Sequence, residues 1–99
     1  MKIKCKKEKD ILNVSLDGRI DMTSASEIEK YLKDRLEDVN TIVFDFGKVD
    51  YLSSAGLVVL LRLKKKQPDN AAYIKIKNVS EPMRSAFSLT GFDGIMEIE

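Results

Sequence analysis

The chain of 99 residues is 43% hydrophobic and 33% charged, and seventeen Lys and Arg residues nearly balance sixteen Asp and Glu residues, for a net charge of +1. This composition excludes a disordered chain, and the charge balance gives no sign of a nucleic acid or an anionic membrane as partner. A chain of this length buries about two thirds of its unfolded surface, so we expect one domain over residues 1–99.

Rare or missing residue types narrow the chemistry. Cys5 is the only cysteine, so neither an internal disulfide nor a thiolate metal site is expected. There is no His, the residue most used for acid–base catalysis near neutral pH, and no Asp-x-Asp-x-Asp-Gly metal loop. We therefore expect a non-enzymatic protein without cofactor or metal. The absence of a signal peptide and of about 18 consecutive apolar residues predicts a cytoplasmic location.

The first two elements are predicted to be strands that pair as a hairpin. Apolar side chains alternate with lysines over residues 2–7, as in a half-exposed strand. The lysines allow two interpretations: a phosphate-binding patch or, as favoured here, a solvated face whose charges discourage edge pairing. Residues 11–18 alternate again and end at Asp17 and Gly18, a dipeptide typical of turns.

An amphipathic helix is expected next, within residues 23–40. Ser24 and Glu27 have the Ser-x-x-Glu spacing of a capping box, which predicts Ser24 as the N-cap. Apolar side chains recur at three- and four-residue steps on one face, namely Ala25, Ile28, Tyr31, Leu32 and Leu36. Charged side chains occupy the other face, so this helix is expected to pack on another element.

The middle of the chain predicts a buried strand followed by a buried helix. Residues 41–47 are apolar except for Asp45, as in a central strand covered on both faces or nearly so. A charge at Asp45 is costly without a hydrogen bond, so we expect a structural partner for it. Residues 57–63 are apolar over most of a helix circumference, and the cations from Arg62 onwards suit the C-terminal end of a helix.

A strand, a helix and a short strand complete the chain. Residues 71–78 alternate as a strand does, and residues 95–98 allow a last strand. Between them a helix is predicted from Ser80, as cap, to Gly91, as C-terminal stop. Its apolar face would carry Met83, Ala86, Phe87, Leu89 and Thr90.

This element order predicts an α/β fold, with a mixed sheet of four to five strands packed with three or more helices on one or both faces. The strand–helix–strand units across the middle of the chain imply parallel strands joined by right-handed crossovers. The first two strands are close enough in sequence to pair antiparallel, which makes the sheet mixed.

Two adjacent serines, Ser53 and Ser54, lie where the central strand ends and the buried helix begins. Ligands and partners usually bind at this carboxyl edge of an α/β sheet, and a helix N-terminus favours negative charge. One serine would cap the helix while the other faces solvent, and the small Ala55 and Gly56 would let another chain approach the backbone. Capping alone explains the pair, and a phosphorylation switch is compatible with it. A nucleophilic serine would need a Gly-x-Ser-x-Gly turn and a His, which are missing.

Three segments, in the right order and at the right separation, resemble the STAS domain family and, within it, the stand-alone anti-sigma factor antagonists of bacteria. LDGRIDMTSASEIEKYL is similar to the family's Leu-x-Gly-x-Ile/Leu-Asp segment and first helix. IVFDFGKVDYLSSAGLVVLLRL is similar to its Asp-Ser-Ser/Thr-Gly-Leu signature with the flanking strand and helix. IKNVSEPMRSAFSLTGFDGIMEI is similar to its closing Asn-Val-Ser stretch. The resemblance covers nearly the whole chain and implies a STAS fold.

The serine that follows the signature Asp is phosphorylated in these antagonists, and it corresponds to Ser54. The resemblance implies a module that, when unphosphorylated, binds an anti-sigma factor that is also a serine/threonine kinase and so frees the sigma factor. Phosphorylation by that kinase ends binding, and a PP2C-type phosphatase resets the module. Gly56 and Leu57 match the signature, whereas Ser53 and Ala55 replace its Asp and its second Ser/Thr.

Asp21 matches a family Asp that packs near the phosphorylated serine, so an interface role and a local capping role are equally supported. The resulting partner-binding surface comprises Asp21, Ser53, Ala55, Gly56 and Leu57, on a protein expected to be a monomer. Two alternatives stay open. One is a STAS adaptor without phosphorylation that docks on another protein such as a transporter ATPase. The other is a small enzyme or nucleotide-binding protein that uses Lys and carboxylates, although the chain has no P-loop pattern.

Overall fold

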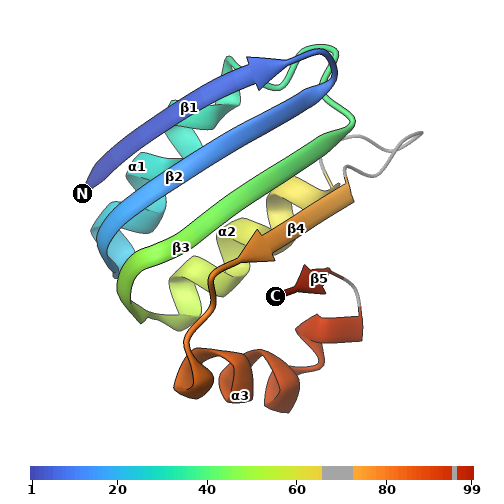
Figure 1. Ribbon diagram of the computed structural model, residues 1–99. Coiled ribbons are helices and arrows are strands. Elements are labelled where there is room, and N and C mark those ends of the chain that lie inside the picture. Colours follow the sequence, from blue (N-terminus) through green and yellow to red (C-terminus); the bar gives the residue numbers. More distant parts are fainter. Residues whose placement is uncertain (66–72, 95) are drawn as a thin grey trace.

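The computed structural model describes residues 1–65, 73–94 and 96–99, and it contains one sheet in the strand order β1-β2-β3-β4-β5 (Figure 1). β1 and β2 pair antiparallel, and the remaining neighbours pair parallel. The strands are β1 (Lys2–Glu8), β2 (Ile11–Ile20), β3 (Thr41–Leu52), β4 (Tyr73–Lys77) and β5 (Glu97–Ile98). The helices are α1 (Met22–Lys33), α2 (Ser54–Lys65), α3 (Glu81–Thr90) and the short 3-10 helix η1 (Phe92–Gly94). The predicted α/β fold with a mixed sheet is confirmed.

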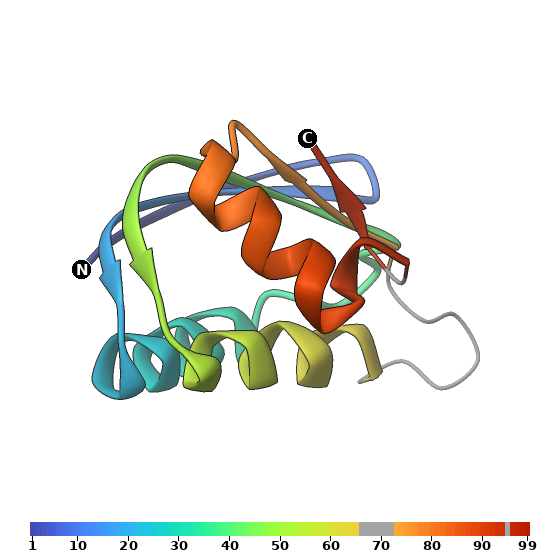
Figure 2. The same cartoon turned by 90° about the horizontal axis from the view of Figure 1, so that it is seen from below.

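The three α-helices lie on one side of the sheet, and its other face is open (Figure 2). α1 and α2 run side by side beneath the sheet, and α3 flanks the core near β4 and β5 (Figures 1 and 2). Every second side chain of the central strands points into the layer between sheet and helices, and the fully buried ones include Leu12, Val14, Ile42, Phe44, Ile74 and Ile76. The hydrophobic core is therefore one layer, on one face of the sheet.

β3 is covered on one face only, so the prediction of a strand covered on both faces is wrong. Thr41, Val43 and Asp45 are only half-buried, on the open face. Val43 lies between Asn13 of β2 and Lys75 of β4, which are polar neighbours. β-branched residues suit a pleated, half-buried surface as well as a core, and this is why the apolar run of β3 did not reveal its open side.

β2 and β3 both continue beyond their predicted ends. Asp17 and Gly18, expected to form a turn, stay inside β2 and pair with Lys48 and Val49. The register shifts just before Asp17 and just after Gly18, and each shift places one extra residue in β3. Gly18 has a φ of 124°, which suits a glycine at such an irregularity. The turn prediction is wrong because β2 continues its parallel ladder with β3 and does not fold back.

α1 begins at Met22 with Asp21 as its N-cap, so the prediction of Ser24 as cap is wrong. The Ser24 N–H donates to Asp21 Oδ1, and the Asp21 N–H donates to Ser24 Oγ, both at 2.9 Å. A capping box is present, but Ser24 occupies the position expected for Glu27. Of the predicted apolar face, Ala25, Ile28 and Leu32 are buried, and Tyr31 and Leu36 are half-buried.

α3 packs through a narrow stripe. Met83 and Phe87 are buried, and the Phe87 ring centroid lies 6.4 Å from that of Phe46. The prediction that Ala86, Leu89 and Thr90 also belong to the buried face is wrong, because these residues are exposed. A helix that touches the core at the edge of the sheet buries only one residue per turn.

The ends of α3 agree with the sequence. Ser80 is the N-cap residue, although its side chain makes no capping hydrogen bond, and Gly91 ends the helix in the left-handed conformation with φ of 77°. The predicted last strand is confirmed as β5. Parts of the predicted elements at residues 66, 71–72 and 95 lie outside the described residues.

Candidate functional site

The carboxyl ends of β2 and β3 lie side by side, and each leads directly into a helix (Figures 1 and 2). β2 ends at Ile20, followed by the α1 cap Asp21, and β3 ends at Leu52, followed by Ser53 and α2. The Ser53 N–H donates to the Ile20 carbonyl oxygen at 2.8 Å and links the two strand ends. The N-termini of α1 and α2 therefore open at one edge of the sheet, where helix dipoles favour negative charge.

Ser53 and Ser54 have different environments at this edge. Ser53 Oγ accepts the Gly56 N–H at 3.3 Å, and the Ser53 carbonyl oxygen accepts the Leu57 N–H at 3.2 Å. Ser53 is thus the cap of α2. Ser54 is the first residue of the helix, is exposed, and has a hydroxyl without a hydrogen-bond partner in the described part of the chain. The expectation that one serine caps while its neighbour faces solvent is confirmed.

Gly56 lies beneath this edge. It is buried, and a Cβ added to it would lie 2.5 Å from Leu52 Cδ1 and 2.7 Å from Ile20 Cγ2. Real Cβ atoms do not approach other atoms so closely, so the missing side chain lets α2 pack against the ends of β2 and β3. The predicted reason for this glycine, room for another chain, is wrong, because this chain's own side chains fill that room.

The surface next to Ser54 consists of apolar side chains. Ala55 and Leu57 are half-buried, and beyond them Met22 and Val58 expose 77% and 46% of their surface. Met22, Ala55 and Val58 line a groove of about 290 Å³ between α1 and α2. Met22 and Val58 are not among the partner-binding residues predicted from the sequence. The available signal was that both are apolar yet lie off the buried stripe of their helices.

The Asp21 carboxylate is held inside its own helix terminus. Hydrogen bonds from the Ser24 backbone N–H and then from the Ser24 hydroxyl lower the pKa of Asp21, and the nearby charge of Arg19 acts in the same direction. Ser24 Oγ also donates to the Arg19 carbonyl oxygen at 2.6 Å, so the buried hydroxyl joins the end of β2 to α1. The local capping role of Asp21 is confirmed, and its role in an interface stays a prediction.

Arg19 and Tyr51 form a second feature of this edge that the sequence did not reveal. They are paired in register across β2 and β3, and the guanidinium carbon of Arg19 lies 4.5 Å from the centroid of the Tyr51 ring. Such a cation–π contact contributes about 0.5–1 kcal/mol at an exposed site. It favours a position of the Arg19 charge at the end of β2, close to Asp21.

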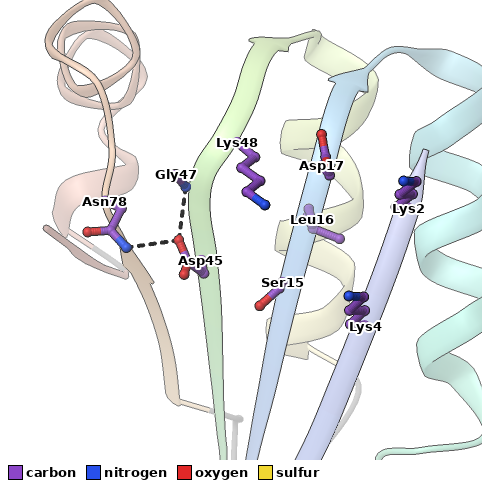
Figure 3. A pocket seen from close by; sticks show the side chains of 9 residues that line it. All are labelled: Lys2, Lys4, Ser15, Leu16, Asp17, Asp45, Gly47, Lys48 and Asn78. Atoms are coloured by element: carbon purple, nitrogen blue, oxygen red, sulfur yellow. Dashed lines mark hydrogen bonds between the residues drawn. The ribbon is translucent and has the colours of Figure 1, made fainter.

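Asp45 does not belong to this edge. It lies on the open face of the sheet, where Oδ1 accepts the Asn78 side-chain amide and the Gly47 N–H, each at 2.9 Å (Figure 3). The Asn78 hydrogen bond is the main reason that the pKa of Asp45 is lowered, and the Gly47 hydrogen bond adds to it. The expectation of a structural partner for Asp45 is confirmed.

The functional groups at this edge are hydroxyls, carboxylates and backbone N–H groups. Within residues 1–65, 73–94 and 96–99, no three His, Cys, Asp or Glu side chains are grouped so as to hold a metal ion. No helix in the same ranges is long and apolar enough to span a membrane. An exposed hydroxyl at a helix N-terminus can accept a phosphoryl group without loss of the helix cap.

The chain is similar in sequence to named bacterial proteins. BtrV of Bordetella bronchiseptica, named as an anti-sigma factor antagonist, is 27% identical over 99 residues, which cover 99% of this chain and 85% of BtrV. The anti-sigma-B factor antagonist of Bacillus subtilis is 27% identical over 93 residues, or 94% of this chain and 85% of that protein.

Solved structures show the same fold. The anti-sigma factor antagonist SpoIIAA in its unphosphorylated form superimposes with a TM-score of 0.84 at 18% identity, over 99% of this chain and 88% of that chain. SpoIIAA from Bacillus in the phosphorylated form gives a TM-score of 0.75 at 19% identity, over 99% and 91%. The sequence pattern of the STAS domain matches residues 2–99. The chain therefore belongs to the STAS domain family.

Proposed function

We propose that this protein is an anti-sigma factor antagonist whose binding to its anti-sigma factor is controlled by phosphorylation of Ser54. The observation that carries the proposal is the exposed hydroxyl of Ser54 on the first residue of α2, next to a separate cap residue, Ser53. The names of the relatives support it, and so does the existence of SpoIIAA in a phosphorylated form.

Phosphorylation at Ser54 would change the surface more than the fold. A phosphoryl group adds about −1.5 to −2 charges at pH 7. The N-terminus of α2 tolerates this charge, because its dipole and free N–H groups favour anions. A partner docked on the same edge would meet new negative charge and bulk. The fold therefore accepts the modification, and the interface does not.

The partner surface would surround Ser54. Asp21, Ser53, Ala55 and Leu57 would contact the partner, while Gly56 would act from below by keeping α2 in place. The partner would be an anti-sigma factor with serine/threonine kinase activity in the cytoplasm, and a PP2C-type phosphatase would remove the phosphoryl group. In this scheme the protein accepts phosphate and catalyses nothing.

A pull-down from lysate of the source organism tests the proposal, with partners and phosphorylation sites identified by mass spectrometry. Wild type and Ser54→Ala should both retain a kinase-type anti-sigma factor, and Ser54→Glu should retain less of it. The kinase with ATP should phosphorylate wild type and the control variant Ser53→Asp, which lacks the Ser53 hydroxyl but keeps the helix cap, and it should not phosphorylate Ser54→Ala. Phosphorylation of Ser54→Ala would refute the site. Equal retention of one partner by all variants would instead indicate a constitutive adaptor.

A further inference from the structure

A hollow of about 520 Å³ lies on the open face of the sheet, away from the helices (Figure 3). Its walls come from β1, β2, β3 and the residue that follows β4. Its polar side chains are those of Lys2, Lys4, Ser15, Asp17, Asp45, Lys48 and Asn78. Small-molecule sites usually have volumes of several hundred Å³, so the hollow is of ligand size.

The hollow coincides with an irregularity in β3. Ser15 pairs with Asp45 but Asp17 pairs with Lys48, so β3 holds one residue more than β2 over this stretch. Such a bulge bends the strand and re-aims a side chain, and bulges are frequent next to functional sites. In Figure 3 the Lys48 side chain extends from β3 towards β2, on the same face as Ser15 and Asp17.

Three lysines line the hollow: Lys2, Lys4 and Lys48. Within the described part of the chain they form no hydrogen bond and no salt bridge, although the charge of Lys48 helps to lower the pKa of Asp45. By contrast, Lys75 on the same face forms an ion pair with Glu97 at 3.4 Å. Unlike Lys75, the lysines of the hollow are therefore not held in a salt bridge.

The hollow also contains two carboxylates, Asp17 and Asp45, which reduce its formal charge to +1. Asp17 is paired in register with Lys2 and with Lys48, and Asp45 accepts hydrogen bonds from Asn78 and Gly47. Asp17 has no hydrogen-bond or ion-pair partner within the described ranges, and neither has the Ser15 hydroxyl. The hollow thus combines three cations with free oxygen atoms that can bind hydroxyl groups.

We propose that this hollow binds a small phosphorylated molecule that carries hydroxyl groups, such as a sugar phosphate. Lys2, Lys4 and Lys48 hold the phosphate, because lysine ammonium groups bind phosphate as mobile point charges. Asp17 and Ser15 accept hydrogen bonds from hydroxyl groups of the ligand. This site differs from the Ser54 edge, and its test does not depend on the function proposed above.

The test is a titration of the full-length, ¹⁵N-labelled protein with ribose 5-phosphate at an ionic strength of about 0.15 M, followed by NMR. Saturable shifts of amide signals around the hollow are expected, with weaker binding of ribose and of inorganic phosphate. Lys48→Gln should weaken binding by about tenfold, because it removes a charged hydrogen-bond donor to the phosphate.

Lys33→Gln, at the exposed end of α1, is the charge-matched control and should bind as the wild type does. Lys4→Gln is a second variant of the hollow and should weaken binding in the same way as Lys48→Gln. Unchanged spectra of the free variants would exclude misfolding. The proposal is overturned by an absence of saturation, by equal weakening in Lys33→Gln, or by binding of ribose alone as tight as that of ribose 5-phosphate.

Discussion

Asp21 and Ser24 hydrogen-bond to each other in both directions at 2.9 Å, and Ser24 Oγ also donates to the Arg19 carbonyl oxygen at 2.6 Å. Ser24 is the one polar residue of the described chain that is buried, with 6% of its surface exposed. These contacts join the last residues of β2 to the first turn of α1. One hydroxyl therefore positions the whole N-terminus of α1 at the proposed partner edge.

Ser24→Ala should lower the free energy of unfolding by about 1–3 kcal/mol, because it leaves buried hydrogen-bonding groups unsatisfied. Urea unfolding followed by circular dichroism measures this change. The control is Ser26→Ala, an exposed position of the same helix, which should stay within about 0.5 kcal/mol of the wild type. Equal effects of the two substitutions would contradict the role of the Ser24 hydroxyl.

Gly56→Ala should destabilise the protein by about 1–3 kcal/mol, because the new methyl group would overlap Leu52 and Ile20. The matched control is Gly94→Ala, where an added Cβ has no atom within 4 Å. Thermal or urea unfolding of the two variants distinguishes them. If Gly56→Ala were as stable as the control, the close packing of α2 on the strand ends would be wrong.

Ser53→Ala should lower stability by about 0.5–2 kcal/mol through loss of the helix cap. Ser53→Asp should retain the wild-type stability, because Asp caps helices about as well as Ser. It also restores the residue of the family signature. Urea unfolding of the wild type and the two variants measures these differences. A Ser53→Asp variant as unstable as Ser53→Ala would show that Ser53 does not stabilise the protein as a helix cap.

Acid should destabilise the fold through Asp21 and Asp45. Hydrogen bonds lower the pKa of both carboxyls in the folded state below their ordinary value of 3.8. A lowered folded pKa gives stability that is present above the unfolded pKa and is lost as pH falls through the folded one. Urea midpoints should therefore drop between about pH 5 and pH 2.

The variant Asp45→Asn isolates one of these contributions. It should show a shallower loss of stability over the same pH range, because its side chain no longer titrates. Asp93→Asn serves as control, since the Asp93 carboxylate has no hydrogen bond within the described residues, and it should keep the wild-type slope. A wild-type slope in Asp45→Asn would mean that the Asn78 hydrogen bond does not stabilise the charged form.

The spacing of apolar residues predicted the fold well, because most helices and strands keep one hydrophobic period along their length. Alternation in β1, β2 and β4 and the stripe of α1 identified the core face, and Gly91 marked the end of α3. The pattern failed in β3, whose apolar side chains do not distinguish a covered face from an open one. It also failed at Asp17 and Gly18, where pairing with β3 overrode the turn preference of the dipeptide.

The candidate site was only partly predictable, for a related reason. The positions of Ser53 and Ser54 follow from the boundary between strand and helix. The function of Gly56 depends on Leu52 and on Ile20, which is distant in sequence. The hollow around Lys48 depends on a register shift between strands. Such contacts arise from tertiary packing, and neither composition nor periodicity contains them.

The close packing at Gly56 limits how far the backbone around Ser54 can move. The first turn of α2 packs closely against Ile20 and Leu52, and the Ser53 N–H donates a hydrogen bond to the Ile20 carbonyl oxygen. A rotation of this turn would break that hydrogen bond and drive the backbone into two side chains. With Ser54 phosphorylated as proposed, the backbone of this turn would keep its position. A partner would then distinguish the two forms by their surface charge.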